Sequence, residues 1–195
     1  MIFTENEKKV LRFIGASGGN LSINELSSEI NISAGSAHKV LTKFEKEDIL
    51  TPHPISNIIT YHFNFKNEKT KPVIELVSAP YPLEGRIKMR AQDLAPLKST
   101  TELCILFGSY ITSKTNPSDL DILFIVEKEK FTDYKKTLSQ VQLITPIKIQ
   151  DVVQTKEDII QNLRQQDVIV VEALKKGIVL WGFETLAEVI RDARN

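Results

Sequence analysis

The sequence predicts an α/β (α+β) protein built in two parts, and three observations point to it. Apolar residues recur at helical spacing in three consecutive N-terminal segments, and a short hairpin pattern follows them. From residue 84 onward, short apolar strand patterns alternate with amphipathic helical patterns, which is typical of a sheet covered by helices. The 195 residues leave room for one large domain or two small ones.

The N-terminal part is predicted to contain three helices. The first runs from Thr4 to Ile14 behind a Thr-x-x-Glu start and ends at the Ser-Gly-Gly that follows. Ser22 precedes a short helix that stops near Asn31, and Ser33 caps a longer third helix. Two such helices joined by a short turn make a helix-turn-helix.

A hairpin is predicted behind the third helix, within residues 49–65. Its second strand alternates from Ile58 to Phe65, and the residues before it are typical of turns: Pro52, Pro54, Ser56 and Asn57. Residues 66–83 are rich in turn residues and polar at their start. We therefore divide the chain into a first domain at 1–65, a linker at 66–83 and a second domain at 84–195.

The second domain is predicted to have four strands and several helices. The expected strands are 101–107, 119–126, 147–153 and 178–181. The expected helices are 84–97, 131–143, 156–163, 168–176 and 184–194. This order gives an α/β layer.

Composition excludes several functional classes. Lys plus Arg and Asp plus Glu each number 25, so the chain has no bulk basic charge for strong sequence-blind nucleic-acid binding. The single cysteine, Cys104, excludes an intramolecular disulfide and a Cys-rich zinc site, and it lies in an apolar strand as an inert core residue. The apolar runs are too short to cross a membrane and the N-terminus carries no signal-peptide core, so we expect a soluble, cytoplasmic protein.

Chemistry is concentrated at the first two strands of the second domain. Gly108 and Ser109 end one strand, and Asp119 and Asp121 open the next, two residues apart and therefore on one face. Adjacent carboxylates repel each other unless a cation lies between them, and Mg²⁺ prefers oxygen ligands. A Gly-Ser turn at a helix start supplies backbone N–H groups that favour a phosphate. The ordinary alternatives are a solvated strand end and a simple turn.

The segment FGSYITSKTNPSDLDILFIV resembles the signature of the DNA polymerase beta-like nucleotidyltransferase superfamily, and is most similar to its small stand-alone, or minimal, members. The resemblance implies a mixed sheet with flanking helices. It also implies that Gly108 and Ser109, with Ser118 beside them, bind the triphosphate of a nucleoside triphosphate. Asp119 and Asp121 would then hold two Mg²⁺ ions for in-line attack on the α-phosphorus by a hydroxyl acceptor.

The resemblance also implies a third catalytic carboxylate on the strand at 147–153. Asp151 is the only acid there, and alternation places it on the face opposite Lys148 and Gln150. If Asp151 faces the other two aspartates, it completes the catalytic set. If Lys148 and Gln150 face them instead, the site lacks its third acid and the domain binds a nucleotide without transferring it.

The first domain resembles winged helix-turn-helix domains of transcription regulators, on the stretch LSINELSSEINISAGSAHKVLTKFEKEDIL. The resemblance implies that its third helix enters the major groove of DNA and presents Ser33, Ser36, His38, Lys39 and Lys43 to bases or phosphates. Residues 1–65 hold six Lys/Arg against seven Asp/Glu, which favours modest DNA affinity. The alternative is a winged helix that serves dimerisation or docking.

Two functional hypotheses follow. The first is a Mg²⁺-dependent nucleotidyltransferase whose winged helix binds a nucleic acid or presents an acceptor, either an RNA or a partner protein. The second is a DNA-binding transcription regulator whose nucleotidyltransferase-like domain is an inactive nucleotide sensor or partner dock. The sequence leaves the nucleotide, the acceptor and a homodimer open.

Overall fold

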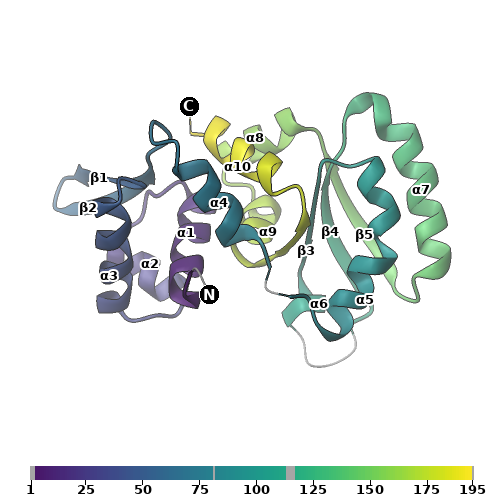
Figure 1. The fold of residues 1–195 in the computed structure, drawn as a ribbon, viewed down its shortest axis with the longest axis horizontal. Coiled ribbons are helices and arrows are strands. Elements are labelled where there is room, and N and C mark those ends of the chain that lie inside the picture. The colour runs from purple at the N-terminus through teal and green to yellow at the C-terminus, as the bar shows by residue number, and fades with distance from the viewer. Residues whose placement is uncertain (1–2, 81, 113–116, 195) are drawn as a thin grey trace.

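The N-terminal part is a three-helix unit closed by a hairpin in the computed structural model, which describes residues 3–80, 82–112 and 117–194 (Figure 1). The helices are α1 (Glu5–Ser17), α2 (Ile23–Glu29) and α3 (Ala34–Lys46). Thr4 and Ser22 close capping boxes at the starts of α1 and α2, and Ser33 caps α3. These caps supply acceptors for backbone N–H groups that a helix start leaves unpaired.

The hairpin consists of two antiparallel strands, β1 (Leu50–Ile55) and β2 (Ile58–Phe63). Pro52 and Pro54, which the sequence pattern assigns to a turn, lie inside β1 opposite Tyr61 and Ile59. Proline lacks a backbone N–H and is tolerated only at a sheet edge. A two-stranded hairpin has only edge strands, and the spacing of two directs both proline nitrogens to the same side of β1.

The segment predicted as a linker contains a helix, α4 (Thr70–Ser78). It packs against both α1 and a C-terminal helix, α10 (Phe183–Asp192). Ile74 of α4 is 2% exposed and belongs to the core cluster of the second domain. The turn residues at 66–69 therefore lead into an ordered connection between the two parts.

The second part is built on a four-stranded mixed sheet with the order β5-β4-β3-β6. Its strands are β3 (Leu103–Phe107), β4 (Asp119–Ile125), β5 (Lys148–Gln154) and β6 (Ile178–Trp181). The β3 strand is antiparallel to both β4 and β6, whereas β4 and β5 are parallel. The mixed sheet predicted for this domain is confirmed.

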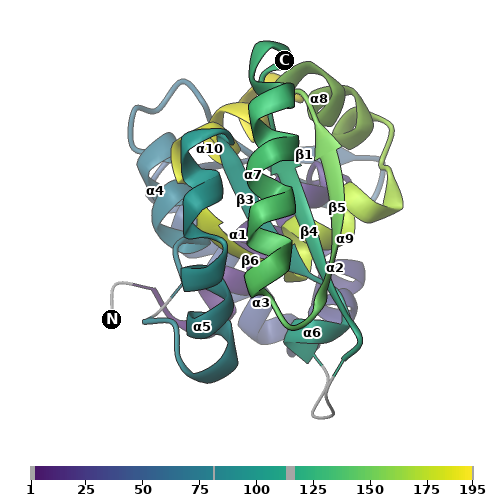
Figure 2. The same cartoon turned by 90° about the vertical axis from the view of Figure 1, so that its right-hand side faces the viewer.

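Helices cover both faces of this sheet (Figure 2). On one face lie α5 (Gly85–Asp93), the 3-10 helix η1 (Ala95–Ser99) and α7 (Phe131–Ile144). On the other face lie α8 (Lys156–Arg164), α9 (Val168–Lys176) and α10. Alternate residues of a strand point to opposite faces and belong to two separate hydrophobic cores. Cys104 and Phe124 pack on the α7 side, and Ile105 and Leu123 pack on the α9 side.

The two parts pack directly on each other, with α1 against α9 and α4 against α10 (Figure 1). Gly15 of α1 lies so close to α10 that a Cβ there would be 3.0 Å from Cδ1 of Ile190. Ion pairs extend the contact, since Nζ of Lys71 lies 2.9 Å from Glu184 and 3.2 Å from Glu188. Within the described residues, no helix has the length and apolar character needed to cross a membrane.

Candidate functional site

A tight turn connects the end of β3 to α6 (Ser109–Thr112). Gly108 makes this turn at φ +72°, a backbone conformation that side-chain-bearing residues rarely adopt. A Cβ at Gly108 would also collide with a carboxylate oxygen of Asp121. The glycine therefore lets the backbone approach that carboxylate closely. Residues 113–116, which follow α6 in the sequence, lie outside the described part of the chain.

Asp119 and Asp121 open β4 and project from the same face of the sheet, the one that α9 covers. Phe107 pairs with Asp121 in the antiparallel register, which places the aspartate beside the Gly-Ser turn. The backbone N–H of Ser109 donates a hydrogen bond to Asp121. Ser118 donates its hydroxyl hydrogen to Oδ2 of Asp119 over 2.9 Å. The structure thus brings the predicted site residues of both motifs together.

The electrostatics of the aspartate pair suit a bound cation. Burial raises the pKa of Asp121, and the negative charges of Asp119 and Glu172 raise it further. Carboxylate oxygens are the ligands that hard divalent cations take, and a cation between two carboxylates removes their repulsion. Among the described residues, no group of three or more His, Cys, Asp or Glu side chains could hold a metal ion.

Asp151 does not join the pair. The parallel register pairs Asp121 with Gln150 and Ile122 with Asp151, and directly paired residues point to the same face. Asp151 thus faces α7, where Oδ2 accepts hydrogen bonds from Tyr134 Oη at 2.8 Å and Lys135 Nζ at 2.9 Å. The expectation that Asp151 serves as the third catalytic carboxylate is corrected by this register, which leaves Lys148 and Gln150 on the aspartate face.

Glu172 of α9 is an acid near the pair that the sequence analysis did not single out. Its charge acts on Asp121, although its side chain is 46% exposed and lies 3.7 Å from Lys176. No local pattern marks it, because it lies on a helix far from the Asp-x-Asp motif in the sequence. Only the packing of α9 over the sheet brings it to this face.

The predicted nucleic-acid residues lie on α3, but they do not all have free side chains. Ser33 is the N-cap of the helix and its hydroxyl bonds to Ser36 at 2.8 Å. Lys43 forms an ion pair with Glu7 of α1 at 2.8 Å and keeps 45% of its side chain exposed. His38 and Lys39 are exposed. These two side chains are the best placed of the five to reach a ligand.

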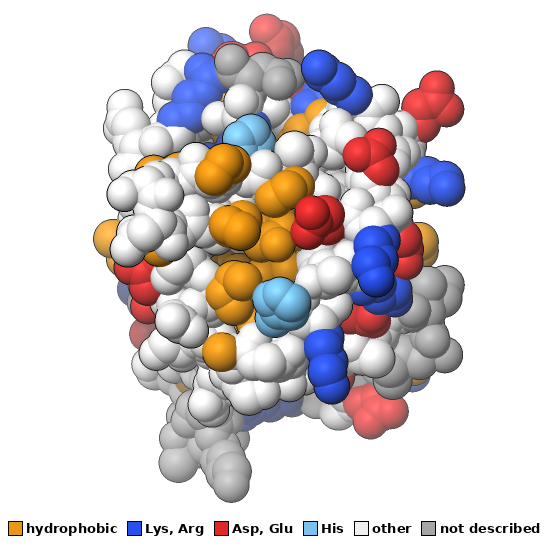
Figure 3. Space-filling model, turned by 90° about the vertical axis from the view of Figure 1, so that its left-hand side faces the viewer, with side chains coloured by type: hydrophobic (Ala, Val, Ile, Leu, Met, Phe, Trp, Pro, Cys, Tyr) orange, Lys and Arg blue, Asp and Glu red, His pale blue; other side chains and the backbone are white. Residues whose placement is uncertain are grey.

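A groove of about 470 Å³ runs along this face of α3 and is lined by His38, Lys39, Thr42, Lys43, Lys46 and Glu47. The adjoining hairpin exposes Ile55 and Ile59 to 49% and 48%. Figure 3 shows this side of the molecule, where apolar side chains gather at the centre and basic side chains lie along the top and the right-hand edge, with acidic side chains among them. The face therefore combines a short basic edge with an apolar patch.

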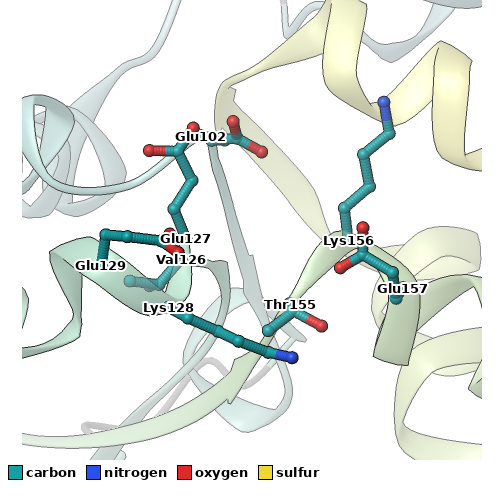
Figure 4. Close-up of a pocket in the computed structure, with 8 residues that line it drawn as sticks. All are labelled: Glu102, Val126, Glu127, Lys128, Glu129, Thr155, Lys156 and Glu157. Carbon is teal, nitrogen blue, oxygen red and sulfur yellow. The ribbon is translucent and has the colours of Figure 1, made fainter.

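A separate cavity of about 390 Å³ lies at the other end of the sheet, beyond the carboxyl ends of β4 and β5 (Figure 4). Its charged lining consists of Glu102, Glu127, Glu129 and Glu157 with Lys128 and Lys156. Burial and the charge of Glu127 raise the pKa of Glu102. The excess of carboxylates disfavours the phosphates of a nucleotide, and no predicted site residue lines this cavity.

Comparison with protein families agrees with this geometry. The fold and the site define a protein in which a helix-turn-helix with a hairpin wing is joined to a nucleotidyltransferase-like sheet carrying an Asp-x-Asp pair. Residues 91–184 match the family described as Polymerase beta, Nucleotidyltransferase, and residues 3–51 match Winged helix-turn-helix DNA-binding. The chain thus has a nucleotidyltransferase-like domain behind a winged helix-turn-helix domain, as predicted. Searches of curated proteins and of solved structures found no match.

Proposed function

We propose that this protein is a DNA-binding regulator whose second domain binds a magnesium–nucleoside triphosphate complex without transferring the nucleotide. One observation carries the proposal: Asp119 and Asp121 lie together beside the Gly108–Ser109 turn, whereas Asp151 faces away from them. The binding elements are therefore present on one face, and the third acid of the transferase pattern is not on it.

Asp119 and Asp121 are the residues that would hold Mg²⁺. The ion supplies positive charge that neutralises the triphosphate, and it usually keeps waters and substrate phosphates among its ligands instead of an all-protein cage. Two carboxylates suffice for such a shared site. The N–H of Ser109 is taken by Asp121, so the backbone N–H groups that follow it in the first turn of α6 would meet the phosphates, with the exposed Ser109 beside them. We expect Mg²⁺ alone to bind far more weakly than Mg²⁺ with a nucleotide.

Calorimetric titration with ATP, CTP, GTP and UTP, each with and without Mg²⁺, tests this function. We expect at least one nucleotide to bind only with Mg²⁺, and the double change Asp119→Asn and Asp121→Asn to abolish binding. Asp151→Asn is the matched control, because it removes an acid from the neighbouring strand on the opposite face. Equal losses in both variants would contradict the assignment of the site.

Nucleotide transfer is the second candidate function, and Glu172 is the observation that favours it. A general base on α9 could replace the acid missing from β5, since its charge already acts on Asp121. Transfer would be established by release of pyrophosphate together with covalent attachment of the α-phosphate-labelled nucleotide to a hydroxyl acceptor, both dependent on Asp119 and lost in Glu172→Gln. Nucleotide binding with no pyrophosphate release would leave the sensor function.

DNA binding is tested by gel shifts with the DNA upstream of the protein's own gene. We expect a salt-sensitive shift that Lys39→Gln weakens, because Lys39 is exposed on the helix expected to enter the groove. Lys136→Gln is the control, because Lys136 is an exposed lysine on α7 and this substitution changes the charge by the same amount. Addition of Mg²⁺ and the bound nucleotide should alter the affinity if the second domain regulates the first. A shift that Lys39→Gln leaves unchanged would contradict this surface.

A further inference from the structure

A second cavity, of about 270 Å³, lies where the two parts of the chain meet. Its walls come from α1, from the end of α4 with the residues after it, and from Lys175 and Ile178 at the junction of α9 with β6. Among its described lining residues are four cations, Lys8, Lys9, Arg12 and Lys175, but only one carboxylate, Glu5. The cavity is thus strongly positive.

Arg12 is a partly buried cation in the wall of this cavity. Its Nη2 donates hydrogen bonds to the carbonyl oxygens of Leu174, at 3.1 Å, and Gly177, so it caps the end of α9. Its Nε and Nη1 donors have no acceptor among the described residues, and no described carboxylate lies within ion-pair distance of it. Burial lowers the pKa of Arg12 to about 10, so the guanidinium is still charged at neutral pH. The site therefore holds a positive charge that carbonyl dipoles balance only in part.

The other cations add to this excess. Lys8 pairs with Glu5 at 3.2 Å, which accounts for the single carboxylate of the lining. Nζ of Lys175 lies 4.2 Å from the centre of the Phe13 ring. Its ion pair with Glu29 is long, at 3.8 Å, and therefore weak. Lys9 is exposed and has no ion pair with a described residue. Three positive charges thus remain with weak partners or none around one cavity.

We propose that this cavity binds a small phosphate-bearing anion and that the anion bridges the two domains. A guanidinium with unpaired N–H donors matches the oxygens of a phosphate, and the flanking lysines supply the remaining charge. The volume lies just below the range of about 300 to 1,000 Å³ that is typical of ligand pockets, so it suits inorganic phosphate or a small phosphorylated molecule better than a nucleotide. Because α1 and α9 both contribute ligands, binding stabilises their packing.

Titration of the full chain with inorganic phosphate tests the proposal, at constant ionic strength kept with sodium chloride. We expect saturable binding by calorimetry and a melting temperature a few degrees higher at saturation. The double change Lys9→Gln and Lys175→Gln should weaken binding at least tenfold. Lys136→Gln and the Asp119→Asn, Asp121→Asn pair should leave the affinity unchanged, which separates this cavity from the nucleotide site.

Three results would overturn the proposal. They are an absence of saturable phosphate binding, unchanged affinity in the double lysine variant, and displacement of phosphate by a short DNA duplex. The last result would assign the cavity to the backbone phosphates of DNA. If the double variant fails to fold, the single change Lys9→Gln decides the question, because this exposed side chain has no ion pair with a described residue to lose. A severalfold weaker phosphate affinity in this variant supports the proposal, and an unchanged affinity refutes it.

Discussion

Gly108 and Asp121 approach each other so closely that the turn leaves no space for a methyl group. We expect Gly108→Ala to destabilise the fold by about 1 to 3 kcal/mol, because alanine at positive φ is strained and its Cβ displaces the Asp121 carboxylate. The same change should abolish nucleotide binding. Urea unfolding and calorimetric titration measure the two effects.

Gly35→Ala is the matched control for that substitution. Gly35 lies in the first turn of α3, and a Cβ there meets no atom within 4 Å. Alanine favours a helix over glycine by up to about 1 kcal/mol, so this variant should be as stable as the parent or more so. Nucleotide binding unchanged in both variants would show that the turn is not part of the site.

Tyr134 illustrates a residue whose role is structural although it contacts a candidate catalytic acid. Burial and the hydrogen bond to Asp151 raise the pKa of Tyr134. The hydroxyl group therefore stays protonated at physiological pH and donates the hydrogen bond to Asp151. We expect Tyr134→Phe to cost about 2 kcal/mol of unfolding free energy, the usual value for a hydrogen bond to a charged group, and to leave nucleotide affinity unchanged. Chemical unfolding and a nucleotide titration of the variant check this. A loss of nucleotide affinity would show that Asp151 contributes to the nucleotide site.

At the scale of elements, Glu7 links α1 to the helix expected to read DNA. Burial raises the pKa of Glu7, but hydrogen bonds from Lys43 and Thr4 outweigh it, so the pKa lies below its ordinary value of 4.5. A lowered folded-state pKa means that the folded chain binds this proton more weakly than the unfolded chain. Glu7 therefore contributes stability that is full above about pH 4.5 and is lost as the pH falls through the folded-state pKa.

We expect Glu7→Gln to lower the melting temperature at pH 7 and to reduce its fall between about pH 5 and pH 3. Melting curves over this pH range measure the effect. Glu29→Gln is the control, because the ion pair of Glu29 with Lys175 is long, at 3.8 Å, and the Glu29 side chain is 57% exposed. Parallel pH profiles of Glu7→Gln and the parent would refute the linkage. The variant also frees Lys43, so its DNA affinity should not fall.

At the scale of the whole molecule, the two domains share buried contacts. Ala16 of α1 and Ile74 of α4 belong to the core cluster formed by α8, α9 and α10. Arg194 adds hydrogen bonds to the carbonyls of Gly15, at 3.1 Å, and Ala16, at 3.3 Å. An interface that includes core residues of both domains couples their unfolding.

Calorimetric melting should therefore show one cooperative transition. Ile74→Ala removes a side chain that is 2% exposed and should cost about 2 to 4 kcal/mol, shifting the whole transition to lower temperature. Leu76→Ala, on the same helix with a side chain that is 47% exposed, should have little effect. Two resolved transitions, of which Ile74→Ala moves only one, would show that the domains melt independently.

Local sequence patterns predict most of the helices and strands. Caps at Thr4, Ser22 and Ser33 mark helix starts because their side chains compete locally for backbone N–H groups. The sequence pattern assigns the prolines of β1 to a turn, whereas the structure places them in a strand, because a strand tolerates proline when it lies at the edge of a sheet. The helix α4 is not predictable from its local pattern, because turn residues surround it and its stability comes from packing on α1 and α10.

Local sequence patterns were sufficient to predict the order of elements. They also predicted the proximity of the Gly-Ser turn to Asp119 and Asp121, because that depends on spacings within one strand-turn-strand segment. They left open the face on which Asp151 lies. That choice required the parallel register of β4 and β5, since a shift of one residue reverses every side chain of a strand. The approach of Glu172 to Asp121 and the basic cavity beside Arg12 also depended on tertiary packing, because their residues are far apart in the chain and meet only where α9 contacts the sheet and α1.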